Sequence, residues 1–221
     1  LKLVLKFGGT SLASPKDITN VAKTIASFSK GNEIVVVCSA VDGVTDTLIL
    51  ISTMIEQRKK NEVGKELDGL IKKHKKLADQ TIKNSVIKKQ LLEKLNADVS
   101  ELQELVRGLT LLKEVSARSL DYLISFGERL SDDLVSFALQ DIKKKSTALN
   151  GKEVGIVTDS NFGESRPLMD TTRIRISKTL GSLLSKKVIP VVGGFAGADQ
   201  HGNVTTFGRG GSDYTATIIA S

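Results

Sequence analysis

The sequence predicts a doubly wound α/β protein, in which a mainly parallel sheet lies inside an α/β/α sandwich that carries a helical insertion. Residues 33–40 contain a continuous β-branched run, which is typical of a strand covered on both faces. Along the chain, a short apolar strand at residues 2–7 comes first, a segment with helical patterning follows it, and the β-branched run comes third. Strand, helix and strand in this order favour a parallel sheet with right-handed crossovers.

The first helix is expected between these two strands. Gly8 and Gly9 end the first strand, and Thr10 or Ser11 is expected to cap the helix that follows. Apolar residues then recur near the helical period as far as Phe28, and a Lys-Gly-Asn sequence stops the helix soon afterwards.

Helical patterning dominates residues 47–137. In its second half, apolar residues recur at three- and four-residue spacings, as in a packed helix. These residues are Leu91, Leu92, Leu95, Val99, Leu102, Leu105 and Val106. No linker rich in proline or glycine flanks this part, so we interpret residues 47–120 as a helical insertion within one domain of residues 1–221.

Strand patterns return after the insertion and alternate with helices. The expected strands are residues 145–149, 153–158, 188–193 and 204–207, and the expected helices are residues 172–184 and a segment from about Ser212. A glycine-rich turn separates the last strand from the last helix.

The composition excludes several classes of protein. Of the 221 residues, 40% are hydrophobic and 26% are charged, as in ordinary globular proteins. No apolar run approaches the roughly 20 residues of a membrane span, and the N-terminal apolar stretch is too short for a signal peptide. Cys38 is the single cysteine, which rules out an intramolecular disulfide and fits the reducing cytoplasm, where we expect the protein.

The net charge of +7 raises the question of a nucleic-acid partner. Much of the basic excess lies in residues 58–94, but acidic residues are interspersed there and Phe, Tyr and Trp are absent. Single-strand binders use such aromatic side chains to stack on bases. We therefore interpret this segment as a solvated helix face, and we expect neither a nucleic acid nor a membrane as partner.

The end of the first strand carries the first candidate for a ligand site, because parallel sheets bind ligands beyond the carboxyl ends of their strands. Gly8 and Gly9 allow a phosphate to approach the backbone, and the amides that follow can point towards it. Lys6 supplies a mobile cation. The alternative is a tight turn with an exposed lysine, and the glycine spacing is not that of a Walker-type loop.

Two further junctions are less specific by themselves. Ser39 and Thr45 flank the loop after the second strand, where hydroxyls could bind a small polar ligand; the alternative is an ordinary loop. Glu128 follows Gly127 within a helical pattern, and its carboxylate suits an ammonium group. The alternative is a surface Glu128 that pairs with Arg129.

Residues 205–216 carry the most informative motif. Three glycines surround Arg209, and Ser212 and Asp213 then start a helix. The arrangement suits an anion that is held by a guanidinium and by backbone amides together. A flexible loop capped by Ser212 would leave Arg209 and the third glycine unexplained.

These segments, in this order, resemble the aspartate kinase family within the amino-acid kinase superfamily. Residues 193–197 are also similar to the family's loop before the arginine motif, and the resemblance runs from end to end of the chain. It implies the amino-acid kinase fold and the ATP-dependent phosphorylation of the side-chain carboxylate of L-aspartate to 4-phospho-L-aspartate. That reaction is the first step towards lysine, threonine and methionine. Kinases of acetylglutamate, carbamate or uridylate share the fold but not the arginine motif.

The resemblance also implies a role for each candidate residue. The implied substrate-binding residues are Ser39, Thr45, Glu128, Phe195, Arg209 and Ser212, with the arginine on a carboxylate and the glutamate on the ammonium group. The implied phosphate-binding residues are Gly8, Gly9, Thr10, Gly210 and Gly211. Lys6 and Asp213 are the implied catalytic residues, the aspartate orienting the lysine or metal-bound water. ATP would arrive with Mg²⁺ held mainly by the nucleotide.

The implied reaction fits the chemistry of the substrate. The side-chain carboxyl of aspartate has a pKa of about 3.9 and is ionised at neutral pH, so the reaction needs no general base. Catalysis would depend on positioning and on neutralising charge at the transferred phosphoryl group.

Some features depart from the family pattern or limit the function. Asp42 stands where a small or apolar residue is expected, and residues 217–221 end within an apolar helix, whereas family members continue into nucleotide-binding strands and ACT domains. We therefore expect a truncated chain. Two alternatives stay open: a ligand-binding part without turnover, and a related amino-acid kinase with another carboxylate substrate. His74 and His201 lack companions at ligand spacing, so no metal site is expected. A homo-oligomer is expected, with the apolar helices of the insertion as its contact.

Overall fold

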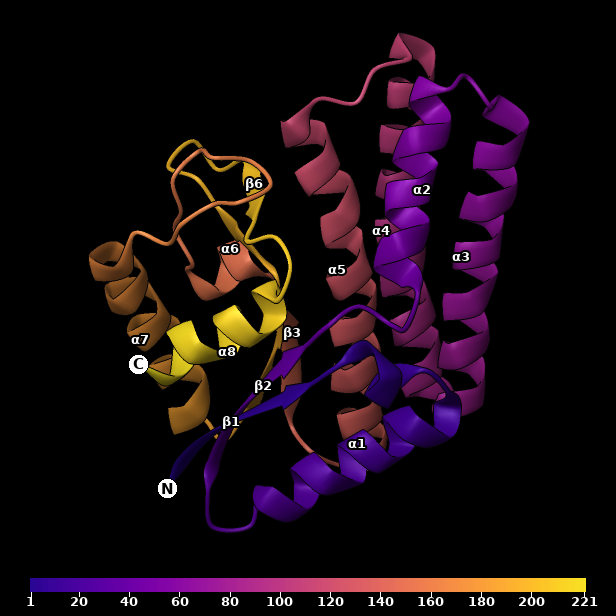
Figure 1. The fold of residues 1–221 in the computed structure, drawn as a ribbon. Helices are drawn as coiled ribbons and strands as arrows, with labels where there is room; N and C mark the ends of the chain where they lie inside the picture. The colour runs from indigo at the N-terminus through magenta and orange to yellow at the C-terminus, as the bar shows by residue number, and fades with distance from the viewer.

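The computed structural model describes residues 1–221 and contains a four-stranded parallel sheet (Figure 1). Its strands are β1 (Lys2–Phe7), β2 (Glu33–Cys38), β3 (Ser146–Leu149) and β4 (Ile189–Gly193), in the spatial order β1-β2-β4-β3. All three strand pairings are parallel. The carboxyl ends of the strands therefore meet at one edge of the sheet, as the sequence predicted.

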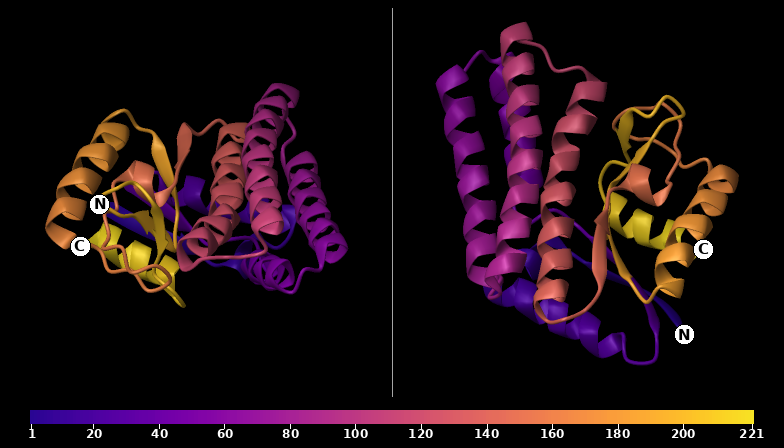
Figure 2. Two further views of the ribbon diagram at one scale, coloured as in Figure 1. Left: turned by 90° about the horizontal axis from the view of Figure 1, so that it is seen from above. Right: turned by 180° about the vertical axis from the view of Figure 1, so that it is seen from behind.

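Helices cover both faces of the sheet (Figures 1 and 2). One face packs against α1 (Pro15–Phe28) and α5 (Ala117–Asp141), and the other against α7 (Met169–Ser185) and α8 (Gly211–Ala220). This arrangement confirms the doubly wound α/β/α sandwich.

The residues of β2 show how this strand is covered on both faces. Ile34 and Val36 belong to the large core cluster with α1 and α5, whereas Val35 belongs to the smaller cluster with α7 and α8. Successive side chains in a strand point to opposite faces. A strand buried on both sides therefore needs apolar residues at every position, which explains the continuous β-branched run.

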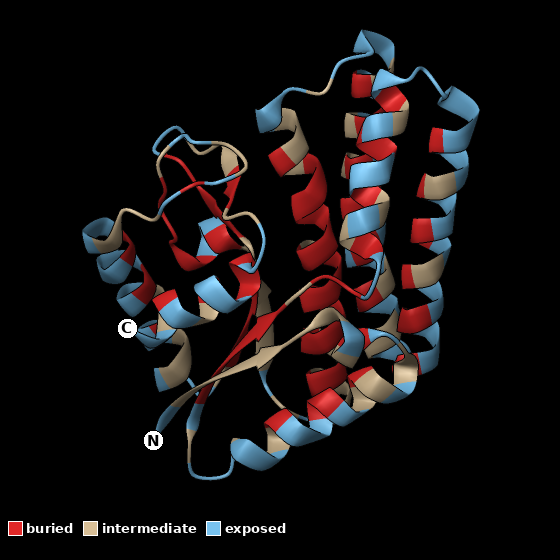
Figure 3. Cartoon of the chain, viewed as in Figure 1, coloured by how far each residue is buried: buried red, intermediate tan, exposed pale blue.

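Three long helices extend the core beyond the sheet: α2 (Val44–Glu56), α3 (Lys60–Thr81) and α4 (Ser85–Leu112) (Figure 1). Their apolar stripes join α1 and α5 in the large core cluster. The chain then returns along α5, which is buried along most of its length and packs against β3 and β4 (Figure 3). No helix of the protein is both long enough and apolar enough to traverse a bilayer.

The expected cap of the first helix is wrong. Thr10 and Ser11 lie in a short 3₁₀ helix, η1 (Gly9–Leu12), and the α-helix begins only at Pro15. Its cap is Ser14, whose hydroxyl accepts a hydrogen bond from the backbone N–H of Asp17. Proline favours the first helical position, because its missing N–H has no partner there.

The expected strand at residues 153–158 is also wrong. Asn150 and Glu153 form a reciprocal capping box that starts a one-turn helix, α6 (Gly151–Val154). Gly155 then ends the helix with a φ of 106°. Only Val157 and Thr158 form isolated bridges.

A small antiparallel hairpin stands beside the main sheet. It pairs β5 (Ala196–Ala198) with β6 (Val204–Thr206). The sequence predicted β6 but not β5, because Ala-Gly-Ala has little β propensity. The close approach of Gly197 to Ile156 and Thr158 explains the glycine, since a Cβ there would lie within 3 Å of both side chains.

Candidate active site

A cavity of about 560 Å³ lies at the carboxyl ends of β1 and β2, between α5 and the start of α8. Most of the residues predicted from sequence line it: Lys6, Gly9, Ser39, Thr45, Glu128, Phe195, Arg209, Gly210, Gly211, Ser212 and Asp213. Gly8 and Thr10 are not among its lining residues. We call this space the acceptor cavity.

Lys6 and Asp213 meet at one side of the acceptor cavity. The Nζ atom of Lys6 lies 2.8 Å from Oδ1 of Asp213. The lysine side chain is 27% exposed and the aspartate side chain 71% exposed, so the pair faces solvent. The ion pair holds a cation at the end of β1, next to the N-terminus of α8.

Gly9 is required by the packing of two loops. A Cβ at this position would lie 2.7 Å from the carbonyl oxygen of Ala40 and 3.3 Å from the backbone of Asp42. The glycine therefore allows the loop after β1 to lie directly against the loop after β2. Close packing alone explains Gly9, whatever ligand the loop binds.

Glu128 lies on α5 at the inner wall of the acceptor cavity and is only 5% exposed. Its Oε1 accepts a hydrogen bond of 3.2 Å from the backbone N–H of Ala40, while its Oε2 has no partner. Burial raises the pKa of this carboxyl group to about 8. Gly127 makes the close approach possible, because a Cβ there would lie 2.9 Å from the side chain of Ala40.

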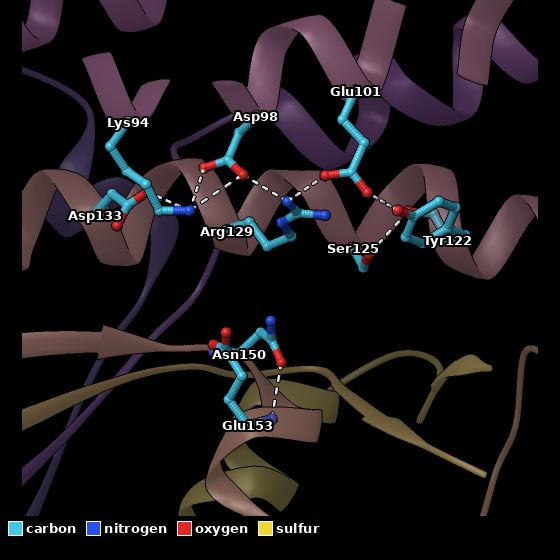
Figure 4. Close-up of polar contacts among 9 residues, drawn as sticks. All are labelled: Lys94, Asp98, Glu101, Tyr122, Ser125, Arg129, Asp133, Asn150 and Glu153. Carbon is cyan, nitrogen blue, oxygen red and sulfur yellow. Dashed lines mark hydrogen bonds and ion pairs between the residues drawn. The ribbon is translucent and has the colours of Figure 1, made fainter. Parts of the chain in front are cut away.

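The alternative pairing of Glu128 with Arg129 is wrong (Figure 4). The Nη2 atom of Arg129 lies 2.5 Å from Asp98 and 2.7 Å from Glu101, both on α4. Lys94 contacts the same aspartate at 3.2 Å. This network joins α4 to α5 and leaves Glu128 without a countercharge.

Arg209 lies in a loop that glycines shape. Gly208 and Gly210 have φ angles of 73° and 80°, in the left-handed region that side chains disfavour. A Cβ on Gly211 would lie 2.9 Å from the ring of Phe195. Arg209 itself is exposed and forms no ion pair, so its guanidinium is free to bind an anion.

Phe195 is held in an uncommon backbone conformation with a φ of 70°. Its N–H donates to Oγ1 of Thr215, and its carbonyl oxygen accepts from the N–H of Phe207. Strained residues of this kind persist where the surroundings fix them, and they are frequent at binding sites.

Asp121 is a residue of this cavity that sequence reasoning missed. It is 1% exposed, and its carboxylate accepts hydrogen bonds from the backbone N–H groups of Gly163 and Thr206 and from the hydroxyl of Thr206. No glycine marks it and it lies inside a helix, so the only available signal was an acidic residue seven positions before Glu128.

A second cavity, of about 800 Å³, lies between α5 and the β5–β6 hairpin. Arg129, Glu101 and Tyr122 line one wall, and Asn150 and Glu153 line the other (Figure 4). Its lining shares only Glu128 with that of the acceptor cavity. The two cavities are therefore neighbours, separated in part by that side chain.

The acceptor cavity brings together groups of opposite charge. It offers two cations, Lys6 and Arg209, and two buried carboxyl groups, of which Asp121 is occupied by hydrogen bonds within the protein and Glu128 has an oxygen without a partner. The hydroxyls of Ser39 and Ser212 also line it. The chain holds no group of three or more His, Cys, Asp or Glu residues that could bind a metal ion. The arrangement suits a small ligand that carries both carboxylate and ammonium groups.

The fold and the cavity define an α/β protein with a cavity lined by charged groups at the carboxyl ends of parallel strands. The sequence model of the amino acid kinase family matches residues 2–221, and the chain belongs to that family.

Within the family, the similarity is to aspartokinases. The chain is 34% identical over 223 residues to aspartokinase 3, chloroplastic, of Arabidopsis thaliana and 31% identical over 220 residues to an aspartokinase of Helicobacter pylori. Each alignment covers 99% of this chain, but only 38% and 39% of the respective relatives. The chain thus spans less than half the length of these proteins.

Solved structures show the same similarity. Escherichia coli aspartokinase III in complex with aspartate and ADP (R-state) matches with a TM-score of 0.87 and 26% identity, covering 98% of this chain and 46% of that chain. The same enzyme in complex with lysine and aspartate (T-state) matches with the same values. These matches confirm the amino-acid kinase fold.

Proposed function

We propose that this chain contributes the acceptor site of a kinase that transfers a phosphoryl group from ATP to the side-chain carboxylate of L-aspartate. The observation that carries the proposal is the acceptor cavity, which holds Glu128 and Arg209 together with Lys6. The relatives support it, since curated proteins similar over 99% of the chain are aspartokinases.

Aspartate carries two carboxylates and one ammonium group, and the acceptor cavity offers a complement to each kind. Arg209 would bind a carboxylate through its planar guanidinium, which forms paired hydrogen bonds with such groups. The free Oε2 of Glu128 would accept a hydrogen bond from the ammonium group. Ser39, Thr45 and Ser212 would donate or accept the remaining hydrogen bonds, and Phe195 would exclude water from one side.

The donor side is represented by Lys6, Asp213 and the loop at Gly9. Lys6 would neutralise charge at the transferred phosphoryl group, and Asp213 would hold the lysine in place, consistent with their 2.8 Å ion pair. Mg²⁺ would be carried mainly by ATP, because the chain has no metal-binding cluster of its own. Gly210 would expose its backbone N–H to a phosphate oxygen, whereas the N–H of Gly211 donates to the carbonyl oxygen of Gly208, so Gly211 would contribute through the shape of the loop.

The product would be 4-phospho-L-aspartate, an acyl phosphate that feeds the synthesis of lysine, threonine and methionine. We place the reaction in the cytoplasm and the protein in a homo-oligomer. A ligand-binding part without turnover is the second candidate, and it is favoured by the predominance of acceptor-side residues in the lining of the cavity.

Hydroxylamine tests the proposed reaction, because it converts an acyl phosphate into a hydroxamate, which gives a coloured complex with iron(III). In a form of the protein that covers the full length of the relatives, we expect ATP-dependent hydroxamate from L-aspartate. Hydroxamate from another amino acid, with none from aspartate, would contradict the substrate assignment.

Calorimetry of the 221-residue chain with aspartate and with ATP separates the two candidates. Binding of aspartate together with normal ATP affinity supports a part that can turn over. If the chain binds aspartate but does not bind ATP, the result supports the second candidate.

A further inference from the structure

The two residues proposed to bind the ends of aspartate come from separate parts of the chain. Glu128 lies on α5, whereas Arg209 lies in the loop between β6 and α8. The loop residue is exposed and has no ion pair of its own. Something else must therefore fix the loop relative to α5 if a ligand as short as aspartate is to reach both groups.

Asp121 connects these two parts. It lies on α5 seven residues before Glu128, which is two helical turns, or about 10 Å along the same face. Its Oδ2 accepts hydrogen bonds from the N–H of Thr206 at 2.8 Å and from the N–H of Gly163 at 2.9 Å. Its Oδ1 accepts the hydroxyl of Thr206 at 2.7 Å. One buried carboxylate thus holds β6 and the loop at residues 159–166 against α5.

Thr206 is fixed on its other side as well. Its carbonyl oxygen accepts hydrogen bonds of 2.9 Å from both the N–H and the hydroxyl of Ser165. Only two residues separate Thr206 from Arg209. Within that short stretch, the N–H of Phe207 donates to the carbonyl oxygen of Phe195.

Gly163 supports the same loop by direct contact. A Cβ on Gly208 would lie 3.0 Å from the carbonyl oxygen of Gly163. The residue that Asp121 holds therefore packs against the residue that precedes Arg209. Two short paths, one through Thr206 and one through Gly163, lead from the carboxylate to the arginine loop.

We propose that Asp121 is a positioning residue that sets the distance between Glu128 and Arg209 and thereby the affinity for the acceptor amino acid. The proposal rests on the proposed function for its ligand. Asp121 would act through Thr206 and Gly163 rather than by touching the phosphoryl group, so the ATP side of the reaction should not depend on it.

Asp199 provides a matched control at the opposite end of the same hairpin. It is 5% exposed, and its carboxylate accepts hydrogen bonds from the N–H groups of His201 and Asn203, the amide of Asn203 and the hydroxyl of Ser160. It holds the turn between β5 and β6, and it does not line the acceptor cavity. A purely structural role would make the two carboxylates equivalent in effect.

The experiment compares Asp121→Ser, Thr206→Val and Asp199→Ser with the unaltered chain by calorimetry with L-aspartate. Asp121→Ser removes the acceptor of three buried hydrogen bonds that hold β6 and Gly163 against α5, so we expect it to weaken aspartate binding by about tenfold or more. Thr206→Val removes only the hydroxyl and should weaken binding less, by about threefold. Asp199→Ser should lower the melting temperature and leave aspartate affinity unchanged.

Limited trypsin digestion gives a second readout that needs no ligand. We expect Asp121→Ser and Thr206→Val to accelerate cleavage after Arg209, as identified by fragment mass, and Asp199→Ser to leave that rate unchanged. If Asp121→Ser fails to fold, the Thr206→Val variant still tests the proposal in both assays.

Unchanged aspartate affinity in both Asp121→Ser and Thr206→Val, or an equal loss in Asp199→Ser, would overturn the positioning role. An unaltered chain that binds no aspartate would instead contradict the proposed function. In that case, the trypsin comparison still decides whether Asp121 holds the arginine loop.

Discussion

Lys6 Nζ and Asp213 Oδ1 lie 2.8 Å apart, which joins the carboxyl end of β1 to the first turn of α8. The two residues lie near opposite ends of the chain, and both line the acceptor cavity. The Asp213 side chain is 71% exposed, so the contribution of the pair to stability is small. Its position in the lining of the cavity fits the role in binding or catalysis that we propose for it.

Replacing Lys6 by alanine should lower turnover and leave aspartate affinity nearly unchanged. Removing one group that neutralises developing charge typically costs about 10²–10³ in kcat. Steady-state kinetics on a form that covers the full length of the relatives would measure this. Lys2→Ala is the control, because Lys2 lies on the same strand, is exposed and does not line the cavity. A tenfold change in aspartate affinity with unchanged kcat would contradict the role of Lys6.

Glu128 should release a proton when aspartate binds. Burial raises its pKa to about 8, so Glu128 is protonated in most molecules at pH 7. The ammonium group of the ligand favours the ionised carboxylate. Binding of one ligand should therefore release about one proton from Glu128 to the buffer. Calorimetry at pH 7 in phosphate and in Tris should therefore give binding enthalpies that differ by roughly the difference between the ionisation enthalpies of the buffers.

Two variants test the assignment of this proton to Glu128. Glu128→Gln should abolish the buffer dependence and weaken aspartate binding, whereas Glu56→Gln on the exposed surface should change neither. The folded-state pKa lies above the ordinary value of 4.5. The folded state therefore holds a proton that the unfolded state loses, and stability falls as pH rises from 4.5 towards 8. Glu128→Gln should remove this fall in ligand-free protein.

Arg209→Ala should weaken aspartate binding while the folded state keeps its stability. A hydrogen bond to a charged group contributes about 1.5–3 kcal/mol, so the loss should be about tenfold to 150-fold in affinity. Arg209→Lys should restore part of the binding, since a lysine keeps the charge but not the paired geometry. Arg118→Ala is the control, because Arg118 is also exposed but lines the second cavity. Equal affinity in Arg209→Ala and the unaltered chain would exclude its role.

The parallel core and the acceptor cavity could be predicted from local sequence. The β-branched run of β2 requires cover on both faces, and parallel strands bring their carboxyl ends to one edge. Polar and glycine-rich segments that follow separate strands must then converge. Lys6 and Ser39 follow β1 and β2, and this convergence explains why both line the acceptor cavity. Arg209 follows β6 of the antiparallel hairpin, and its place in the same cavity was implied only by the resemblance to the aspartate kinase family.

The remainder depends on contacts between residues far apart in sequence. Asp121 reaches Thr206 across 85 positions, and Arg129 finds its partners on α4 rather than at the neighbouring Glu128. No periodicity encodes such pairs. The expected strand at residues 153–158 is wrong for a local reason. The capping box at Asn150 starts a helix where the apolar pattern had indicated the start of a strand.

His74 should make the protein sensitive to acid. Its ring is 1% exposed in the core around α3, Nδ1 contacts the carbonyl oxygen of Leu70, and Nε2 has no partner. Burial lowers its pKa from 6.5 to about 4. Below pH 6.5 the His74 imidazole is protonated in the unfolded state but stays neutral in the folded state. The free energy of unfolding therefore falls as the pH drops from 6.5 towards 4. The loss by pH 4.5 should be about 2–3 kcal/mol.

Urea unfolding of His74→Leu and of the unaltered chain at pH 7 and pH 4.5 isolates this effect, because all other titrating groups are common to both. The unaltered chain should lose about 2–3 kcal/mol more than the variant between the two pH values. His201→Leu is the control, since His201 is exposed and should leave the pH dependence as it is. If His74→Leu and the unaltered chain lost the same free energy of unfolding between pH 7 and pH 4.5, the buried imidazole would have to bind its proton as readily in the folded state as in the unfolded state. That result would contradict the lowered pKa, and Nε2 would then need a hydrogen-bond partner in the folded protein.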